Sequence, residues 1–301
     1  MSLVRRSLLL LPPALVALAS QFGGSGCAEP TTGPTRGTLR VAAAGAALSL
    51  VRAEADTFMR LYPKSRIEVF GAGTVAALES LVNGQADVAA LWRAPTPEEQ
   101  LIAKTTGDSL LVFPYSVDGL GIIVAGANDV PELTPEQVRG LLMGEIRDWS
   151  EVGGPSLPVT VYAPELTNGV AELVIRDILG GRTPAWVAMP GDTLAPSGVL
   201  IMDGGQMTVG GLEMAGDPNR AVPIKLSSGE QALLHPVDLI RKRYPWVTKH
   251  VFCVHGEARD LKSGFISYVT SAQGQKVVVG LGYGPATMPT RLITLGGKSG
   301  S

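Results

Sequence analysis

Residues 110–179 constrain the fold more than any other stretch, because strand, helix and turn signals follow one another there in a fixed order. An apolar run at residues 117–124 predicts a buried strand. Thr134-Pro135-Glu136 then supplies the cap, first-turn proline and acidic residue of a helix start. A turn at residues 146–154 and a strand at residues 159–162 come next, followed by a loop and a helix. This order is typical of an open α/β sheet.

The first third of the chain alternates strand and helix three times. Thr74 is expected to cap the second helix and Thr96 the third, because each hydroxyl precedes a helical pattern. Consecutive strand–helix units favour parallel pairing, so we expect mostly parallel sheets. The further strands expected from apolar patterns are at residues 38–42, 66–70, 86–91, 208–214 and 250–255.

Length and composition indicate a globular protein with room for two domains. The chain has 301 residues, of which 45% are hydrophobic and 17% are charged. Its 25 basic and 27 acidic residues give a formal net charge of -2 and form no dense block of either sign. Nucleic acids and anionic membrane surfaces are therefore excluded as expected partners.

The N-terminus has the pattern of an export signal. Arg5 and Arg6 precede an apolar run at residues 8–19 that is too short to span a bilayer. Two processing routes stay open, namely cleavage after Ala19 and lipidation of Cys27, and we favour lipidation because small residues precede Cys27. The paired arginines also fit a twin-arginine export signal. We expect an exported, periplasmic or cell-surface protein whose contact with the membrane is a lipid on Cys27.

Four segments carry a resemblance to a known family. They are residues 118–124, 133–138, 149–154 and 271–278. Together they resemble the phosphate-type periplasmic solute-binding proteins that feed ABC importers, and the similarity extends from Leu39 to Pro285. The resemblance implies an α/β, two-lobed type II periplasmic-binding-protein fold, in which each lobe is a mostly parallel sheet flanked by helices and two hinge crossings join the lobes. The boundaries that follow are 1–26 for the signal peptide, 27–37 for a flexible tether, 38–125 and 225–301 for lobe 1, and 126–224 for lobe 2.

The resemblance also implies a ligand site between the lobes. In the family, a small oxyanion is held by backbone N–H groups at helix starts, hydroxyls, an arginine and an aspartate, and helix starts favour negative charge. Carried over position by position, the candidate ligand-binding residues are Ala47, Leu48, Ser49, Gly73, Thr74, Trp92, Arg93, Thr167, Asn168 and Gly169.

The chain departs from the family pattern at two charged positions. Trp92-Arg93 stands where the family has its aspartate, and Ala163 stands where it has its arginine. We hypothesise that Arg93 supplies from one lobe the positive charge that Ala163 no longer supplies from the other. The alternative is that Arg93 is a solvated surface residue. Glu165 would repel an anion unless it points away or pairs with Arg93. The resemblance implies phosphate, and sulfate, molybdate and arsenate stay open.

Other chemistry finds little support in the sequence. The spacing of His235, His250 and His255 matches no metal site, and the glycine-rich segments lack the lysine of a nucleotide phosphate loop. Cys253 and His255 share a strand face, but the surrounding alternation indicates a buried strand rather than a nucleophile and its base. Asp118 is interpreted as a turn-initiating residue near the hinge or the cleft.

The expected function is therefore binding, not catalysis, with no cofactor or metal. A monomer would carry an oxyanion to the permease of an ABC importer. The alternative is a cell-surface sensor or interaction protein that keeps the fold without tight anion binding.

Overall fold

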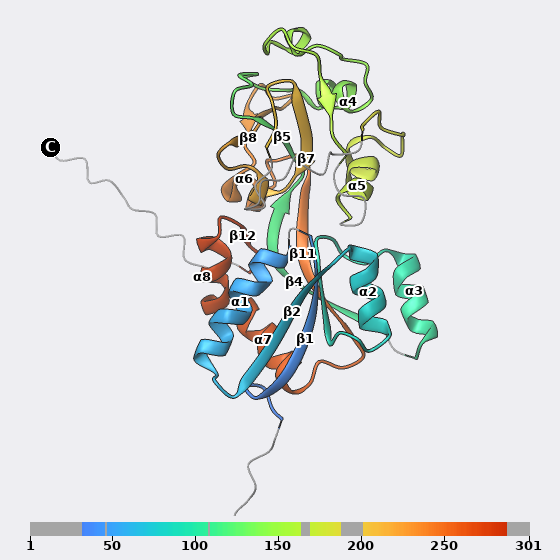
Figure 1. The fold of residues 1–301 in the computed structure, drawn as a ribbon, viewed down its shortest axis with the longest axis vertical. Coiled ribbons are helices and arrows are strands. Elements are labelled where there is room, and N and C mark those ends of the chain that lie inside the picture. The colour runs from blue at the N-terminus through green and yellow to red at the C-terminus, as the bar shows by residue number, and fades with distance from the viewer. Residues whose placement is uncertain (1–31, 46, 108, 164–168, 188–200, 288–301) are drawn as a thin grey trace, which may run out of the picture. The chain divides into compact units, whose positions relative to one another are not determined.

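The computed structural model describes residues 32–45, 47–107, 109–163, 169–187 and 201–287 (Figure 1). Several sequence predictions lie outside these residues: the signal peptide, Cys27, Glu165, Thr167 and Asn168. Within the described part, none of the helices combines the length and the apolar character needed to cross a membrane.

Six strands form the first sheet, in the order β12-β4-β11-β3-β1-β2. Its members come from both ends of the chain: β1 (Gly37–Ala44), β2 (Ser65–Ala72), β3 (Val88–Leu91), β4 (Leu110–Gly119), β11 (Val247–His255) and β12 (Gly284–Pro285). Strands β1, β2 and β3 pair in parallel, as the strand–helix repeats predict, whereas β11 pairs antiparallel with both β3 and β4. The prediction of a mostly parallel sheet was wrong, because β11 enters between β3 and β4 in the opposite direction.

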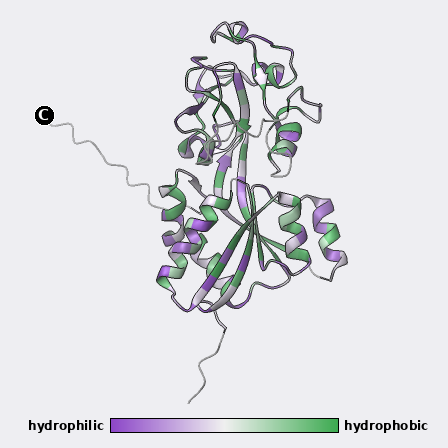
Figure 2. Ribbon diagram, viewed as in Figure 1, coloured by the Kyte–Doolittle hydropathy of each residue, from purple (hydrophilic) through white to green (hydrophobic). Residues whose placement is uncertain are grey.

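Helices cover both faces of this sheet (Figure 1). One face packs on α1 (Ala47–Leu61), α7 (Asp260–Thr270) and α8 (Ala272–Gly280), and the other on α2 (Thr74–Val82) and α3 (Pro97–Thr105). Hydrophobic and hydrophilic residues alternate along these helices, so each buries one side and exposes the other (Figure 2). Helix α3 begins with the predicted cap, since Thr96 and Glu99 form a reciprocal capping box.

The second sheet has four strands in the order β6-β7-β5-β8. They are β5 (Gly121–Ala125), β6 (Thr160–Val161), β7 (Gln206–Gly210) and β8 (Asn219–Ala221). Only β6 and β7 pair in parallel, so this sheet is also mixed. The remaining elements of this half are α4 (Pro135–Leu142), η1 (Trp149–Val152), α5 (Val170–Leu173), η2 (Val174–Ile178), η3 (Leu212–Met214), β9 (Ile224–Lys225), β10 (Gln231–Ala232) and α6 (Pro236–Ile240).

The chain passes between the sheets at two neighbouring points. The apolar run expected to be one strand is split, because β4 ends at Gly119 and β5 begins at Gly121 in the other sheet. The Leu120 N–H donates to the carbonyl of Trp246, just before β11, so the two crossings are hydrogen-bonded to each other. The lobe boundaries at residues 125/126 and 224/225 stay a prediction.

The stretch expected to be a tether includes a described turn. Gly33 and Arg36 exchange backbone hydrogen bonds, and the carbonyl of Pro34 lies against Gly264 of α7, where a side chain would not fit. The tight contact indicates that this turn packs on the first sheet's helices.

Candidate functional site

The start of α2 carries a buried hydroxyl group. Gly73 is the N-cap of this helix and makes no side-chain capping bond, whereas Thr74 is its first helical residue. The prediction that Thr74 caps α2 was therefore wrong. Thr74 is only 1% exposed, and its Oγ1 has no hydrogen-bond partner among the described residues. The helix start thus combines N–H groups that lack a capping side chain with a buried, unused hydroxyl, a combination suited to a negatively charged ligand.

Gly169 brings the second half of the molecule to the same place. It precedes α5 with a φ of 81°, a conformation that favours glycine. A methyl group at Gly169 would lie 2.9 Å from Thr74 Oγ1 and 3.5 Å from Arg93 Nε. Three of the residues chosen from the sequence therefore converge, although Gly169 comes from the other half of the molecule than Thr74 and Arg93.

Arg93 holds a network of ion pairs across the same contact. Its Nη1 and Nη2 donate to the two carboxylate oxygens of Glu99 at 2.8 and 2.9 Å, and its Nε donates to Glu172 Oε2 at 2.6 Å. Nη1 also donates to the carbonyl of Ala94, and Nη2 lies 2.6 Å from Glu172 Oε2. Four of the five guanidinium N–H groups thus donate hydrogen bonds, and Nη2 is in addition ion-paired with Glu172.

Burial and charge explain how Arg93 stays ionised in this position. Burial alone would lower the pKa of Arg93, but the hydrogen bonds and charges of Glu99 and Glu172 raise it above its usual value. The Arg93 bonds and the backbone N–H of Thr96 in turn hold the pKa of Glu99 down, against the effect of its burial. Because Arg93 is 3% exposed, the interpretation of a solvated surface arginine was wrong.

The other residues chosen from the sequence have different surroundings. Ala47, the first residue of α1, is fully buried, and Leu48 packs near Gly71. Trp92 is also fully buried, and its Nε1 donates to Asp118 at 3.0 Å, which leaves no polar group of its side chain for a ligand. Ser49 is exposed and hydrogen-bonds to Tyr283.

Asp118, interpreted from the sequence as a turn-initiating residue near the hinge or the cleft, lies in β4 and belongs to a polar cluster at the crossing between the sheets. Its Oδ1 accepts from the N–H groups of Gly119 and Leu212, so it joins β4 to the turn after β7. The carboxylates of Asp118 and Glu213 both occupy the place that a side chain on Gly211 would take. Burial raises the pKa of Asp118 to about 6, against the effect of these hydrogen bonds.

Glu213 shares this cluster although it is exposed to solvent. Desolvation of its carboxylate, together with the charge of Asp118, raises the pKa of Glu213 to about 8, while hydrogen bonds from the backbone at Glu213 and Gly211 and from Tyr283 oppose the shift. No local motif marks Glu99, Glu172 or Glu213 as site residues, and the sequence reasoning missed all three.

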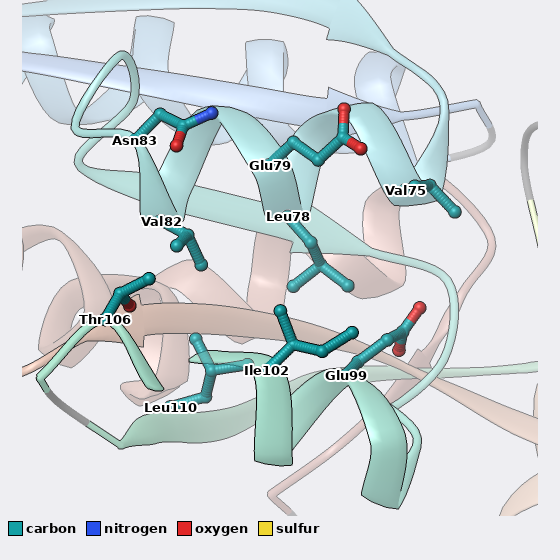
Figure 3. A pocket seen from close by; sticks show the side chains of 9 residues that line it. All are labelled: Val75, Leu78, Glu79, Val82, Asn83, Glu99, Ile102, Thr106 and Leu110. Atoms are coloured by element: carbon teal, nitrogen blue, oxygen red, sulfur yellow. The ribbon is translucent and has the colours of Figure 1, made fainter. Parts of the chain in front are cut away.

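Two hollows border these elements. The larger, of about 610 Å³, lies beside Arg93 and is lined from both halves, by Leu173 and Arg176 as well as by Lys249 of β11. The smaller, of about 300 Å³, lies between α2 and α3, where Leu78, Val82, Ile102 and Leu110 point toward one another (Figure 3). The larger hollow gives access to the Arg93 network, whereas the smaller one is apolar.

The described residues offer little for metal or nucleophilic chemistry. They contain no group of three or more histidine, cysteine or acidic side chains arranged to hold a metal ion. Cys253 is fully buried, and burial raises the pKa of its thiol to about 12. His255 contacts Thr106 at 3.2 Å. The thiol is therefore kept neutral and away from solvent.

Comparisons with known proteins agree with a binding protein. The phosphate-binding protein PstS of Bacillus subtilis is 22% identical over 289 residues, which is 93% of each chain. The PstS of Pseudomonas aeruginosa is 24% identical over 259 residues, which is 77% of each chain.

Among solved structures, a substrate-binding protein of Clostridium perfringens with bound phosphate has a TM-score of 0.71 at 19% identity, covering 83% of this chain and all of that one. An ABC-type phosphate transport receptor of Vibrio cholerae has a TM-score of 0.63 at 20% identity, with the same coverage. These likenesses confirm the α/β fold. A family model described as the PBP superfamily domain matches residues 28–273, so the chain belongs to the PBP superfamily, a family of binding proteins rather than of enzymes.

Proposed function

We propose that this protein binds a small inorganic oxyanion outside the cytoplasmic membrane and delivers it to the permease of an ABC importer. Phosphate is the first candidate, because the relatives that cover most of the chain are named as phosphate-binding proteins. The proposed site is formed by the start of α2, by Arg93 and by Gly169, which approaches from the other half of the molecule.

The unpartnered hydroxyl of Thr74 is the observation that carries this proposal. A buried polar group without a hydrogen bond costs about 1–3 kcal/mol, so a fold keeps one where something else compensates. At the start of a helix, an oxyanion would accept a hydrogen bond from this hydroxyl and from the neighbouring N–H groups. Closure of the two halves over the anion is then favoured, since both contribute contacts.

Isothermal titration with phosphate tests the proposal when Thr74→Val and Thr74→Ser are compared with the unchanged protein. Valine keeps the shape of threonine but removes the hydroxyl, so we expect phosphate affinity to fall about tenfold, which corresponds to about 1.4 kcal/mol. Serine keeps the hydroxyl and should keep the affinity within about threefold. Because the hydroxyl is unpartnered, Thr74→Val should not lower the melting temperature of the free protein. Unchanged affinity in Thr74→Val would contradict the site.

One observation favours a second candidate, a surface sensor or interaction protein without tight anion binding. All three guanidinium nitrogens of Arg93 already donate hydrogen bonds, and two carboxylates outnumber its single charge. Titrations with phosphate, sulfate, molybdate and arsenate separate the two functions. Heat of binding with any of the four supports transport, whereas flat titrations with all four support the sensor.

Export and anchoring complete the proposal. A signal at residues 1–26 and a lipid on Cys27 would hold the protein at the outer side of the membrane. Cell fractionation of a Cys27→Ala variant tests this, because loss of the lipid should move the protein from the membrane to the soluble exported fraction. We further propose that the protein acts as a monomer, which light scattering of the purified protein tests.

A further inference from the structure

The two carboxylates on Arg93 are held in different ways. Glu99 lies six residues along the chain, on α3, and its carboxylate also closes the capping box by accepting from the Thr96 N–H at 2.7 Å. Its side chain is 20% exposed. Glu172 comes from α5 in the other half, and its side chain is 58% exposed. Glu99 is therefore fixed in place, whereas Glu172 can leave Arg93 for water.

The charges around Arg93 make Glu172 the surplus partner. One buried cation needs one anion to offset its charge, and the bidentate bond to Glu99 supplies it. Glu172 adds a second negative charge and occupies the edge of the guanidinium formed by Nε and Nη2. An ion pair with this much exposure contributes little to stability, so its displacement is easy.

This edge of Arg93 faces the proposed site. Arg93 Nε and Thr74 Oγ1 both lie within 3.5 Å of the position that a methyl group on Gly169 would take. The hollow of about 610 Å³ beside Arg93, lined by Leu173 and Arg176 on the Glu172 side, offers space for a displaced carboxylate. An anion bound between Thr74 and Arg93 would meet the carboxylate of Glu172 on the same N–H groups.

We propose that Glu172 is a tethered competitor of the ligand: its carboxylate occupies the Arg93 edge in the free protein, and an anion binds by displacing it. This inference rests on the proposed oxyanion function. Glu172 would then lower the apparent affinity for the anion, because the anion binds only to the fraction of molecules in which Glu172 has left Arg93.

Three variants test the competition by isothermal titration with phosphate at low ionic strength. Glu172→Gln removes the charge at the Arg93 edge. Glu172→Asp keeps the charge but shortens the side chain by about 1.5 Å, which breaks the 2.6 Å contact with Arg93. Glu145→Gln is the matched control, because it removes the same charge from an exposed position in the same half. Circular dichroism and melting temperatures verify that all three are folded.

Competition predicts tighter phosphate binding in both Glu172 variants. We expect about a fivefold gain, which corresponds to about 1 kcal/mol, and a change of less than twofold in the Glu145 control. Weaker or unchanged binding in Glu172→Gln would overturn the proposal. Tighter binding in Glu172→Gln with unchanged binding in Glu172→Asp would also overturn it, because the effect would then be long-range charge rather than occupation of Arg93.

The same titrations separate this inference from the proposed function. Binding by the unchanged protein with equal affinity in the variants refutes the competition alone. Absence of binding in the unchanged protein but binding in the two Glu172 variants supports the competition strongly. Absence of binding in all of them refutes the oxyanion function, and the competitor with it.

Discussion

Replacing Gly169 with alanine tests whether the two halves of the molecule form one site. The new methyl group would lie 2.9 Å from Thr74 Oγ1, closer than carbon and oxygen normally approach, and 3.5 Å from Arg93 Nε. The neighbouring atoms of Thr74 belong to the rigid first turn of α2. We therefore expect the segment around Gly169 to move away from α2 by a few tenths of an ångström or more.

Two separate costs follow from the structure. Gly169 has a φ of 81°, and an alanine in this conformation costs about 1 kcal/mol whatever surrounds it. The contact with Thr74 adds a second cost of about 1 kcal/mol. Gly181 isolates the first cost, because its φ is 87° and no atom lies within 4 Å of a methyl group there. Gly181→Ala should thus lose about 1 kcal/mol of unfolding free energy, and Gly169→Ala about 2 kcal/mol.

Urea unfolding measures both losses, and titration with phosphate measures the effect on the site. We expect phosphate affinity to fall about tenfold in Gly169→Ala and to stay within twofold in Gly181→Ala. Equal unfolding free energies in the two variants would mean that Gly169 does not touch Thr74. Equal affinities would mean that the contact exists but does not take part in binding. Either result would refute the reasoning.

Three further predictions concern stability. Burial raises the pKa of Glu54 from 4.5 to about 8, so the folded state holds its proton more tightly, and the unfolding free energy should fall by about 5 kcal/mol as the pH rises through this range. Glu54→Gln should flatten this dependence in urea unfolding, and an unchanged slope contradicts it. Gly121→Ala would clash with Leu234 at the crossing and should lower the melting temperature by several degrees, from about 2 kcal/mol of overpacking; an unchanged melting curve contradicts it. Gly264→Ala should displace the carbonyl of Pro34 and speed proteolysis near that residue, whereas unchanged cleavage would show that the turn does not pack there.

Signals confined to a few neighbouring residues could be read from the sequence. Thr96 and Thr134 each begin a helix through a capping box, as the hydroxyl, proline and acid or amide spacing predicts. Their energetics depend on atoms within one helical turn. Thr74 shows the limit of such reasoning, because a hydroxyl beside a helix start does not reveal whether it or the preceding Gly73 is the cap.

The crossing at Leu120 could not be located from hydrophobicity. Residues on both sides of it are buried, so the apolar pattern runs unbroken from β4 into β5. The two flanking glycines were the available signal. A side chain at Gly119 would meet Leu239 and the carbonyl of Trp246, and one at Gly121 would clash with Leu234. Glycine is required there because Leu234, Leu239 and the backbone of Trp246, which precede the second crossing, pack directly against residues 119–121.

The pairing of Arg93 with Glu172 lay beyond any local pattern, since 79 residues separate them and they belong to opposite halves. The sequence suggested that Arg93 replaces a positive charge lost at Ala163, and the structure adds that this charge is already matched by Glu99 and exceeded by Glu172. A ligand shifts a conformational equilibrium only by its difference in affinity for the two states. If Glu172 holds α5 against Arg93 before any ligand arrives, an anion gains only the difference between its own contacts and those of Glu172. Contact between the two halves then does not by itself indicate that an anion is bound, whereas release of Glu172 from Arg93 into solvent does.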